Sequence, residues 1–251
     1  MNSPILKAEG LQKYFDTGAA RTLVLPGLEL SFRQGEFAVI MGNSGSGKST
    51  LLYLLSGLDQ PSAGQVSIAG DSLHDKTERQ LALLRRDQVG FVFQQYHLIP
   101  NLTLLENVLL PGLLGRKKRR EVKERANELF RQLDIDGLQH RRPAEVSGGE
   151  QQRCCIARAL INEPNILMAD EPTGNLNSSA SAKVLDCLSD LHNRGQTVIM
   201  VTHHPQSACR GERVLFLKDG SVLDEFIFQN DLKDLAAREQ ALVEWLGKQG
   251  W

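Results

Sequence analysis

The sequence predicts an α/β protein built around a parallel β-sheet, and two kinds of segment carry that prediction. One is a loop of the pattern G-x-x-x-x-G-K-[ST] at residues 42–49, which stands between a short apolar run and a helical run. The others are three further short apolar runs, each followed by polar residues. Buried parallel strands have this composition, because helices cover both faces of the sheet. A chain of 251 residues is long enough for such a unit with an inserted subdomain.

The loop that follows the first apolar run has the features of a phosphate-binding loop. Its glycines let the backbone N–H groups approach an anion, and the helix at 51–57 adds partial positive charge at its N-terminus. Lys48 is expected to reach the β- and γ-phosphates, and the Ser49 hydroxyl to ligate Mg²⁺. An ordinary Gly/Ser turn is the alternative, which the flanking strand and helix disfavour. The expected nucleotide contacts are Gly42, Asn43, Ser44, Gly45, Ser46, Gly47, Lys48, Ser49 and Thr50.

Polar side chains follow the other apolar runs, at 89–93, 166–169 and 197–202. Because ligands bind at the carboxyl ends of parallel strands, we expect these side chains at the edge that carries the phosphate loop. A phosphate loop, a strand-end Asp and Mg²⁺ are typical of a nucleoside triphosphatase. The expected roles are Asp170 close to the metal, Glu171 orienting or deprotonating the attacking water, Gln94 bridging metal and water, and His203 hydrogen-bonding the γ-phosphate.

The remaining elements follow from local signals. Strands are expected within 5–34, most clearly at 23–25 and 28–32, and again at 65–70. Tyr14 and Phe15 could each stack on a base, although lone aromatic residues more often serve packing. A hairpin is expected at 213–223, and a packed helix from Asp231 to Leu246 with apolar positions that include Leu232 and Leu235.

A mostly helical subdomain is expected at about 96–160. A capping box begins one helix at Thr103, and Ser147 is an expected N-cap followed by Gly148 and Gly149, which is either a second anion site or only a capped helix. The charged run 117–127 is interpreted as a solvated helix face with a Glu121–Arg125 pair, rather than as a lipid contact. Apolar residues near its start either dock a partner or belong to the core: Leu98, Ile99, Leu102, Leu104 and Leu105.

Composition excludes several classes. A net charge of -1 gives no basic field for nucleic acid. The four cysteines lack metal spacing and are expected to be small apolar residues in a reducing compartment. We find no signal-peptide pattern and no apolar run of the roughly 18 residues that a spanning helix needs. The expectation is a cytosolic protein that reaches a membrane only through a partner.

Together these motifs resemble the ATP-binding subunit of an ABC transporter. The resemblance covers residues 5–225 and rests on the Walker A loop, the Q-loop residue Gln94, the signature beginning at Ser147, the Walker B strand ending at Asp170 and the switch residue His203. It implies a RecA-like P-loop core with an antiparallel β subdomain and the inserted helical subdomain. The implied division is a cassette at 5–228 and a helical tail at 229–251.

The resemblance also implies partners and site roles. Two copies would sandwich two ATP molecules with Mg²⁺, so that Ser147, Gly148 and Gly149 contact a nucleotide held by the other subunit. It favours Phe15 over Tyr14 for adenine stacking. An integral membrane permease on a separate chain would be the partner, which places the ATPase on the cytoplasmic face of the inner membrane; no nucleic acid partner is expected.

Narrower motifs at 91–100 and 170–176 are similar to those of the lipoprotein-releasing LolD, macrolide-exporting MacB and cell-division FtsE group. Two positions depart from that group, because Asn177 and His204 stand where it has aspartates. An active ATPase is still expected. The alternatives are a regulatory ATP-binding module with weak hydrolysis, which Asn177 would allow, and a soluble ABC-type ATPase that acts on DNA or ribosomes.

Overall fold

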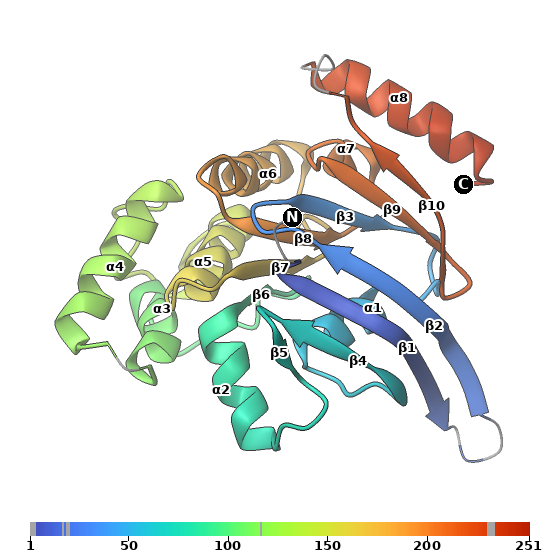
Figure 1. The fold of residues 1–251 in the computed structure, drawn as a ribbon. Helices are drawn as coiled ribbons and strands as arrows, with labels where there is room; N and C mark the ends of the chain where they lie inside the picture. Colours follow the sequence, from blue (N-terminus) through green and yellow to red (C-terminus); the bar gives the residue numbers. More distant parts are fainter. Residues whose placement is uncertain (1–3, 17, 19–20, 116, 230–233) are drawn as a thin grey trace. The chain divides into compact units, whose positions relative to one another are not determined.

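The computed structural model describes residues 4–16, 18, 21–115, 117–229 and 234–251. The chain forms two compact units (Figure 1). Unit one comprises Met1–Leu81 and Thr197–Trp251, and unit two comprises Ala82–Gln196. The chain therefore leaves unit one after Leu81 and returns to it at Thr197. The α/β prediction is confirmed, since parallel strands, an antiparallel sheet and helices are all present.

Unit one contains the antiparallel sheet, with strand order β2-β1-β4-β5. Its strands are β1 (Leu6–Asp16), β2 (Arg21–Phe32), β4 (Ala63–Ile68) and β5 (Asp71–Ser72). The expectation of separate strands at 23–25 and 28–32 is wrong, because both belong to β2. Pro26 between them resembles a turn residue, yet it pairs with Gln12 of β1. A proline is tolerated there because β2 is an edge strand, whose outer N–H groups need no partner strand.

The parallel strands of unit one position the phosphate loop. They are β3 (Phe37–Met41), β8 (Thr197–Val201) and β9 (Arg213–Lys218). β3 pairs in parallel with β8 on one side and β9 on the other, and every residue of β3 and β8 is buried. The expected hairpin is confirmed, since β10 (Ser221–Ile227) pairs antiparallel with β9. Two helices of this unit directly follow parallel strands: α1 (Lys48–Ser56) and α7 (Pro205–Ala208).

The C-terminal helix α8 (Leu235–Lys248) lies along the β9–β10 hairpin (Figure 1). Its N-cap Asp234 accepts a hydrogen bond from Ala237 N, and it buries Leu242 and Leu246 as predicted. Leu235 was predicted to pack on the body as well, but it is exposed in the first turn, so that part of the prediction is wrong. The expected start, Asp231 and Leu232, lies outside the described residues. Among the helices that the structure describes, none combines the length and the apolar character needed to cross a bilayer.

Helices dominate unit two. Helix α2 (Glu78–Gln88) leads into it, and the others are α3 (Leu104–Leu113), α4 (Arg119–Gln132), α5 (Gly148–Leu160) and α6 (Ser178–Asn193), with a 3₁₀ turn at Pro143–Glu145. Two parallel strands, β6 (Val89–Val92) and β7 (Ile166–Asp170), complete the unit. The sequence analysis did not assign α2, although Thr77 and Gln80 form reciprocal capping hydrogen bonds at its start.

The charged run on α4 lies at the surface, but the expected Glu121–Arg125 pair is wrong. Glu121 instead accepts a hydrogen bond from the backbone N–H of Lys118, at the start of the helix. Arg125 pairs with Glu128 at 3.5 Å and also with Glu163, which lies beyond α5. A glutamate in the first turn of a helix tends to accept a hydrogen bond from the backbone N–H of the N-cap. The i,i+4 spacing alone therefore gave the wrong partner for Glu121.

Candidate functional site

The phosphate loop occupies the turn from β3 into α1, and its glycines are structural requirements. A Cβ atom on Gly42 would lie 2.2 Å from the carbonyl oxygen of Leu217, which leaves no room for a side chain. Gly45 and Gly47 have φ angles of +80° and +96°, which L side chains rarely adopt. The loop pattern identified at sequence level therefore corresponds to a backbone path that only glycine can follow at these positions.

The N-terminus of α1 lacks the side-chain cap that most other described helices of this protein have. Its N-cap is Gly47, with no side-chain cap and no acidic residue in the first turn. Helices α3 and α5, by contrast, begin with Ser or Thr capping boxes. The first four N–H groups of a helix have no intrahelical partner and carry partial positive charge. An anion is the natural ligand for such an end.

Lys48 adds a full positive charge beneath this loop. Its side chain is buried, and its Nζ donates to the carbonyl oxygens of Gly42 and Asn43 at 2.8 and 2.9 Å. The Ser46 hydroxyl is also buried and has no hydrogen-bond partner among the described residues. Ser49 is exposed in the first turn of α1. The loop thus holds a cation and hydroxyl groups at an uncapped helix start, a donor set that fits a phosphate with its Mg²⁺.

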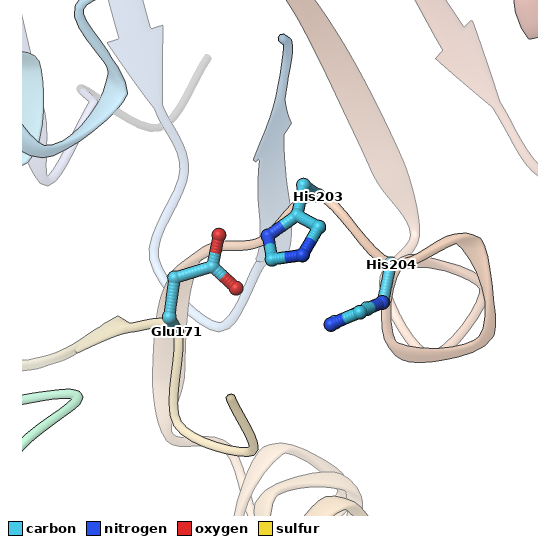
Figure 2. A group of neighbouring side chains, drawn as sticks. All are labelled: Glu171, His203 and His204. Atoms are coloured by element: carbon cyan, nitrogen blue, oxygen red, sulfur yellow. The ribbon is translucent and has the colours of Figure 1, made fainter. Parts of the chain in front are cut away.

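His203 follows β8, the strand next to β3 in unit one. Buried Thr202 ties the two strand ends together, because its N–H donates to Ile40 O and its Oγ1 accepts from His204 N. His203 and His204 are exposed, and their ring centroids are 3.9 Å apart (Figure 2). The structure therefore places His203 on the strand neighbouring the phosphate-loop strand, as the strand-end prediction required.

In unit two the carboxylates follow β7. Asp170 ends the strand and Glu171 comes next, and both are buried. Figure 2 shows the Glu171 side chain. Glu171 has a φ of +46°, a left-handed conformation that costs a non-glycine residue about 1–3 kcal/mol. The Gly174 N–H donates to Glu171 O at 3.0 Å and closes a turn directly after it. A strained backbone held by a tight turn fixes the direction of a side chain, which suits a catalytic carboxylate.

Gln94 lies beside this turn. Strands β6 and β7 are parallel, with Val92 opposite Ala169, so Gln94 follows the strand next to that of Asp170. Asn175 Nδ2 donates to Gln94 O at 3.1 Å. A Cβ atom on Gly174 would lie 2.9 Å from Gln94 Nε2, so glycine makes room for the amide. The structure thus brings together the predicted residues of unit two that follow its strands.

The predicted N-cap at Ser147 is confirmed. Ser147 Oγ accepts from Glu150 N, while the Glu150 carboxylate accepts from Ser147 N at 2.7 Å. The Ser147 hydroxyl and the Ser147 N–H both donate to the Glu150 carboxylate, and these hydrogen bonds hold the pKa of Glu150 below its ordinary value. A Cβ atom added to Gly148 would lie 2.6 Å from Tyr96 Oη. A Cβ atom added to Gly149 would lie 3.0 Å from Ala180 Cβ. The two glycines therefore let the start of α5 approach its neighbours closely.

Three residues of α5 that the sequence analysis missed hold the backbone on both sides of Gln94. Gln152 donates to Phe93 O at 3.4 Å, and Cys155 Sγ donates to Tyr96 O at 3.0 Å. Arg158 donates to the same Tyr96 oxygen at 2.8 Å. Burial raises the pKa of Cys155 to about 11, which keeps the thiol protonated as a donor. Their spacing of three residues, which places them on one helix face, is the signal that could have revealed them.

Asn177 has a local structural role. It is the N-cap of α6, and its side-chain oxygen accepts a hydrogen bond from Ala180 N at 2.9 Å. Asn and Asp are about equally good at this position, so the departure from the group does not disturb the helix start.

The two candidate base-stacking residues differ in their surroundings. The Tyr14 ring faces the guanidinium of Arg21 at 4.2 Å, and its hydroxyl donates to Gln12. Phe15 is 42% exposed, so its ring has accessible surface for a base.

An apolar groove of about 640 Å³ lies within unit two. Asn107 is buried beneath it and exchanges hydrogen bonds with the backbone of Ile99, which fixes the loop before α3. Ile99, Leu110 and Leu114 line it with exposed side chains. Leu104 is fully buried, so of the two alternatives left open by the sequence it belongs to the core and does not dock a partner.

Comparison with known proteins places the chain among ATP-binding cassettes. Residues 25–174, more than half of the chain, match the family model described as ABC transporter. The lipoprotein-releasing system ATP-binding protein LolD of Aquifex aeolicus is 46% identical over 88% of this chain and 97% of its own length. The macrolide export ATP-binding/permease protein MacB of Pectobacterium atrosepticum is 44% identical over 89% of this chain. The matched region spans only 34% of that MacB protein's length.

Solved structures agree. The dimeric structure of MJ0796, described as a bacterial ABC transporter cassette, superposes with a TM-score of 0.83 at 40% identity. It covers 90% of this chain and 99% of its own, and a structure of the same cassette in a post-hydrolysis state with ADP and Pi matches equally well. The cbiO1 cassette from Clostridium perfringens matches at TM-score 0.80 and 26% identity, over 89% of this chain and 88% of its own. The chain therefore belongs to the ABC transporter family and is an ATP-binding, ATP-hydrolysing cassette of it.

Proposed function

We propose that this cassette hydrolyses Mg-ATP at its phosphate loop, as one subunit of a homodimer that drives a membrane permease. The observation that carries the proposal is the start of α1, where a glycine N-cap without any acidic neighbour lies above the buried cation of Lys48. Anionic phosphates satisfy the helix N–H groups and this cation together. Residues 42–50 form the proposed phosphate contact.

The proposed Mg²⁺ ligands are the Ser49 hydroxyl and the Asp170 carboxylate, with Gln94 as a third oxygen donor. All three are hard oxygen groups, which Mg²⁺ prefers. When bound, the metal neutralises charge on the phosphates. Exposed Ser49 stands at the helix start that would receive these phosphates, which supports its assignment.

Glu171 is the proposed base for the attacking water. Its carboxylate accepts the water's proton as the water oxygen bonds to the γ-phosphorus and the bond from that phosphorus to the β–γ bridging oxygen breaks, so that ADP leaves. His203 donates a hydrogen bond to the γ-phosphate. The left-handed backbone at Glu171 supports this role, because strain of this kind is retained where a side chain must have one orientation. Gln94, held at its backbone by Asn175, would orient the same water.

Ser147, Gly148 and Gly149 are proposed to contact the nucleotide held by a second copy of the chain. Ser147 is exposed and Gly148 is partly exposed, so the start of α5 offers surface to a second subunit, which supports this assignment. The dimer of the similar cassette MJ0796 is the precedent for this arrangement. Phe15 is the proposed adenine-stacking residue, because its ring is the more exposed of the two candidates.

The apolar groove of unit two is the proposed docking site for a permease. Its exposed residues are of the kind that mark interfaces. Relatives named as export ATP-binding/permease proteins and as part of a lipoprotein-releasing system favour a membrane subunit as the occupant. Through that subunit, encoded as a separate chain, the cassette would lie on the cytoplasmic face of the inner membrane.

The test is affinity purification of the tagged protein from detergent-solubilised membranes, in the wild type and in the groove variant Ile99→Asp. We expect the wild type to retain an integral membrane protein that stimulates its ATPase activity, and Ile99→Asp to lose that protein while keeping basal activity. Leu223→Asp, at an exposed apolar residue of unit one, is the matched control. Retention of the membrane protein by Ile99→Asp, or purification with ribosomes or DNA instead, contradicts the proposal.

A further inference from the structure

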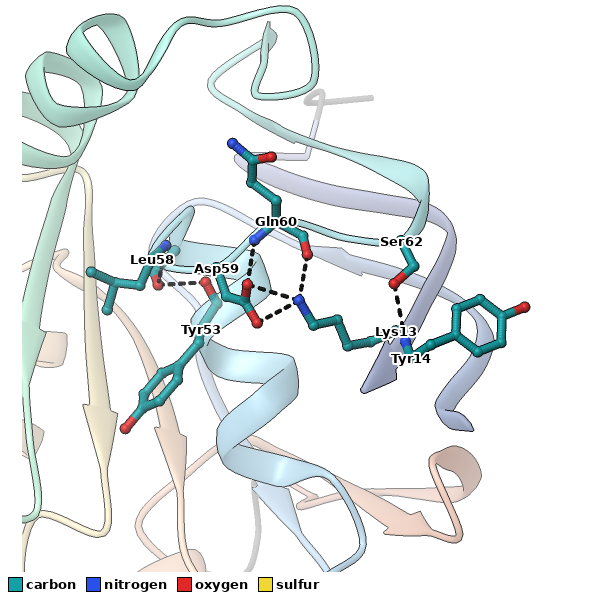
Figure 3. Close-up of polar contacts among 8 residues, drawn as sticks. Lys13, Tyr14, Tyr53, Leu58, Asp59, Gln60 and Ser62 are labelled. Atoms are coloured by element: carbon teal, nitrogen blue, oxygen red, sulfur yellow. Dashed lines mark hydrogen bonds and ion pairs between the residues drawn. The ribbon is translucent and has the colours of Figure 1, made fainter. Parts of the chain in front are cut away.

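Lys13 of β1 makes an unusual set of contacts for a surface-strand lysine (Figure 3). Its side chain is only 12% exposed, and its Nζ lies 2.8 and 2.7 Å from the two carboxylate oxygens of Asp59. The same Nζ donates to Gln60 O at 2.8 Å. Lys7, on the same strand, pairs with Glu9 in the ordinary manner, with 47% of its side chain exposed. The Lys13 pair therefore has a degree of burial that a solvated surface pair lacks.

Asp59 and Gln60 belong to the segment that directly follows the phosphate-loop helix. The Leu58 N–H donates to Tyr53 O in the last turn of α1, which fixes the near end of this segment. At its far end, Ser62 N donates to Gln12 O of β1 (2.8 Å), and Tyr14 N donates to the Ser62 hydroxyl (3.0 Å). The segment 58–62 is thus bonded to α1 at one end and to β1 at the other, with Lys13 pinned to its middle (Figure 3).

Lys13 also contacts the proposed base-stacking ring. Its Nζ is 5.1 Å from the centroid of the Phe15 ring, within the range of a cation–π interaction. Residues i and i+2 of a strand lie on the same face, which explains how the two side chains meet. A cation over one face of the ring leaves only the other face for a base. The ammonium group therefore restricts the orientation of the Phe15 ring and the face on which a base can stack.

We propose that Lys13 is a positioning residue for the nucleotide base. It joins the strand that carries Phe15 to the segment that leaves the phosphate-loop helix, and so sets the distance between the base-stacking ring and the phosphate loop. This inference rests on the proposed role of Phe15. Its consequence is specific: loss of Lys13 weakens the part of ATP affinity that comes from adenosine and spares the part that comes from phosphates.

The experiment compares Mg-ATP with Mg-tripolyphosphate, which lacks the nucleoside, by isothermal titration calorimetry on the full chain. Lys13→Met keeps the apolar stem and removes the charge; we expect it to weaken ATP binding about three- to tenfold and to leave tripolyphosphate binding unchanged. Lys13→Arg restores the cation and should recover ATP affinity. Lys7→Met is the matched control on the same strand and should change neither ligand.

A double-mutant cycle with Phe15→Ala tests whether Lys13 acts through the ring. In the Phe15→Ala background, Lys13→Met should cause no further loss of ATP affinity. Equal losses for ATP and tripolyphosphate, or additive losses in the cycle, overturn the inference. If Phe15→Ala weakens ATP binding and Lys13→Met does not, the Lys13 role alone fails. If Phe15→Ala leaves ATP affinity unchanged, the proposed base subsite fails, and the role of Lys13 with it.

Discussion

The two helix N-termini that the sequence marks as anion sites are built in opposite ways. Helix α1 starts at Gly47, without a side-chain cap or an acidic residue, and Lys48 places a buried cation beneath its loop. Helix α5 starts at Ser147 with a complete capping box, in which the Glu150 carboxylate adds a negative charge to the first turn. The first helix start has no side-chain cap, whereas the second is capped by the side chains of Ser147 and Glu150.

This difference indicates which end binds ATP in the single chain. An anion at α1 gains hydrogen bonds and charge neutralisation, since nothing in the first turn competes with it. An anion at α5 meets a carboxylate and an occupied cap, so only a phosphate positioned by other contacts would add favourable interactions there. A second subunit that presents its own Mg-ATP supplies such a phosphate. We therefore expect α1 to set monomer affinity and α5 to act only in the dimer.

The largest expected effect is the loss of ATP hydrolysis in Glu171→Gln. This variant should also hold the ATP-bound dimer, which is needed to test the role of α5. The amide keeps the shape of the side chain but cannot accept the proton, so hydrolysis should fall about 10²–10⁴-fold while ATP binding remains. Gel filtration with Mg-ATP should show a persistent dimer. A variant that stays monomeric and hydrolyses ATP at the wild-type rate contradicts the role assigned to Glu171.

Lys48→Ala tests the α1 side of the comparison. Removing the cation and its charge-assisted hydrogen bonds to phosphate should weaken monomer ATP binding about a hundredfold, as measured by calorimetry. Lys7→Ala, which removes an exposed lysine, is the control. Unchanged affinity in Lys48→Ala would refute the phosphate-loop assignment.

Ser147→Ala tests the α5 side. In the Glu171→Gln background it should leave monomer ATP affinity unchanged and weaken ATP-driven dimerisation about tenfold, measured by analytical ultracentrifugation. Loss of the cap should also lower the free energy of unfolding by about 1 kcal/mol. Thr103→Ala breaks the equivalent box on α3 and serves as the matched control, with a similar loss of stability and no effect on dimerisation. A fall in monomer ATP affinity in Ser147→Ala would remove the distinction between the two helix starts.

The smallest effect concerns the charge of the α5 box. Hydrogen bonds from Ser147 lower the pKa of Glu150 below its ordinary value of 4.5. The carboxylate therefore stabilises the fold at pH values above this and loses its contribution as the pH falls through the folded-state pKa. In Glu150→Gln the free energy of unfolding should decline less steeply between about pH 5 and pH 3 than in the wild type. Urea denaturation at each pH measures this decline. A decline as steep as in the wild type would show that the box has no net electrostatic role.

Local sequence determined the parts of this protein in which the interacting residues are neighbours in the chain. The phosphate loop and the caps at Thr103 and Ser147 each depend on backbone geometry within a few residues, which residue type dictates directly. The polar residues after each buried strand were predictable for a similar reason, since the carboxyl end of a parallel strand is where a ligand can be reached.

Tertiary structure alone decided the contacts that join distant segments. The Lys13–Asp59 pair spans 46 residues, and the hydrogen bonds from α5 to the backbone around Gln94 span about 60. No periodicity in the sequence predicts such partners, because each lysine could pair with many different carboxylates. Only the folded chain brings one of them within hydrogen-bond distance. The two apolar runs beside Pro26 were predicted as separate strands, because whether a proline can lie within a strand depends on which strand is at the edge of the sheet. Burial of Leu104 was likewise settled by packing, since an apolar side chain fits a core and an interface equally well.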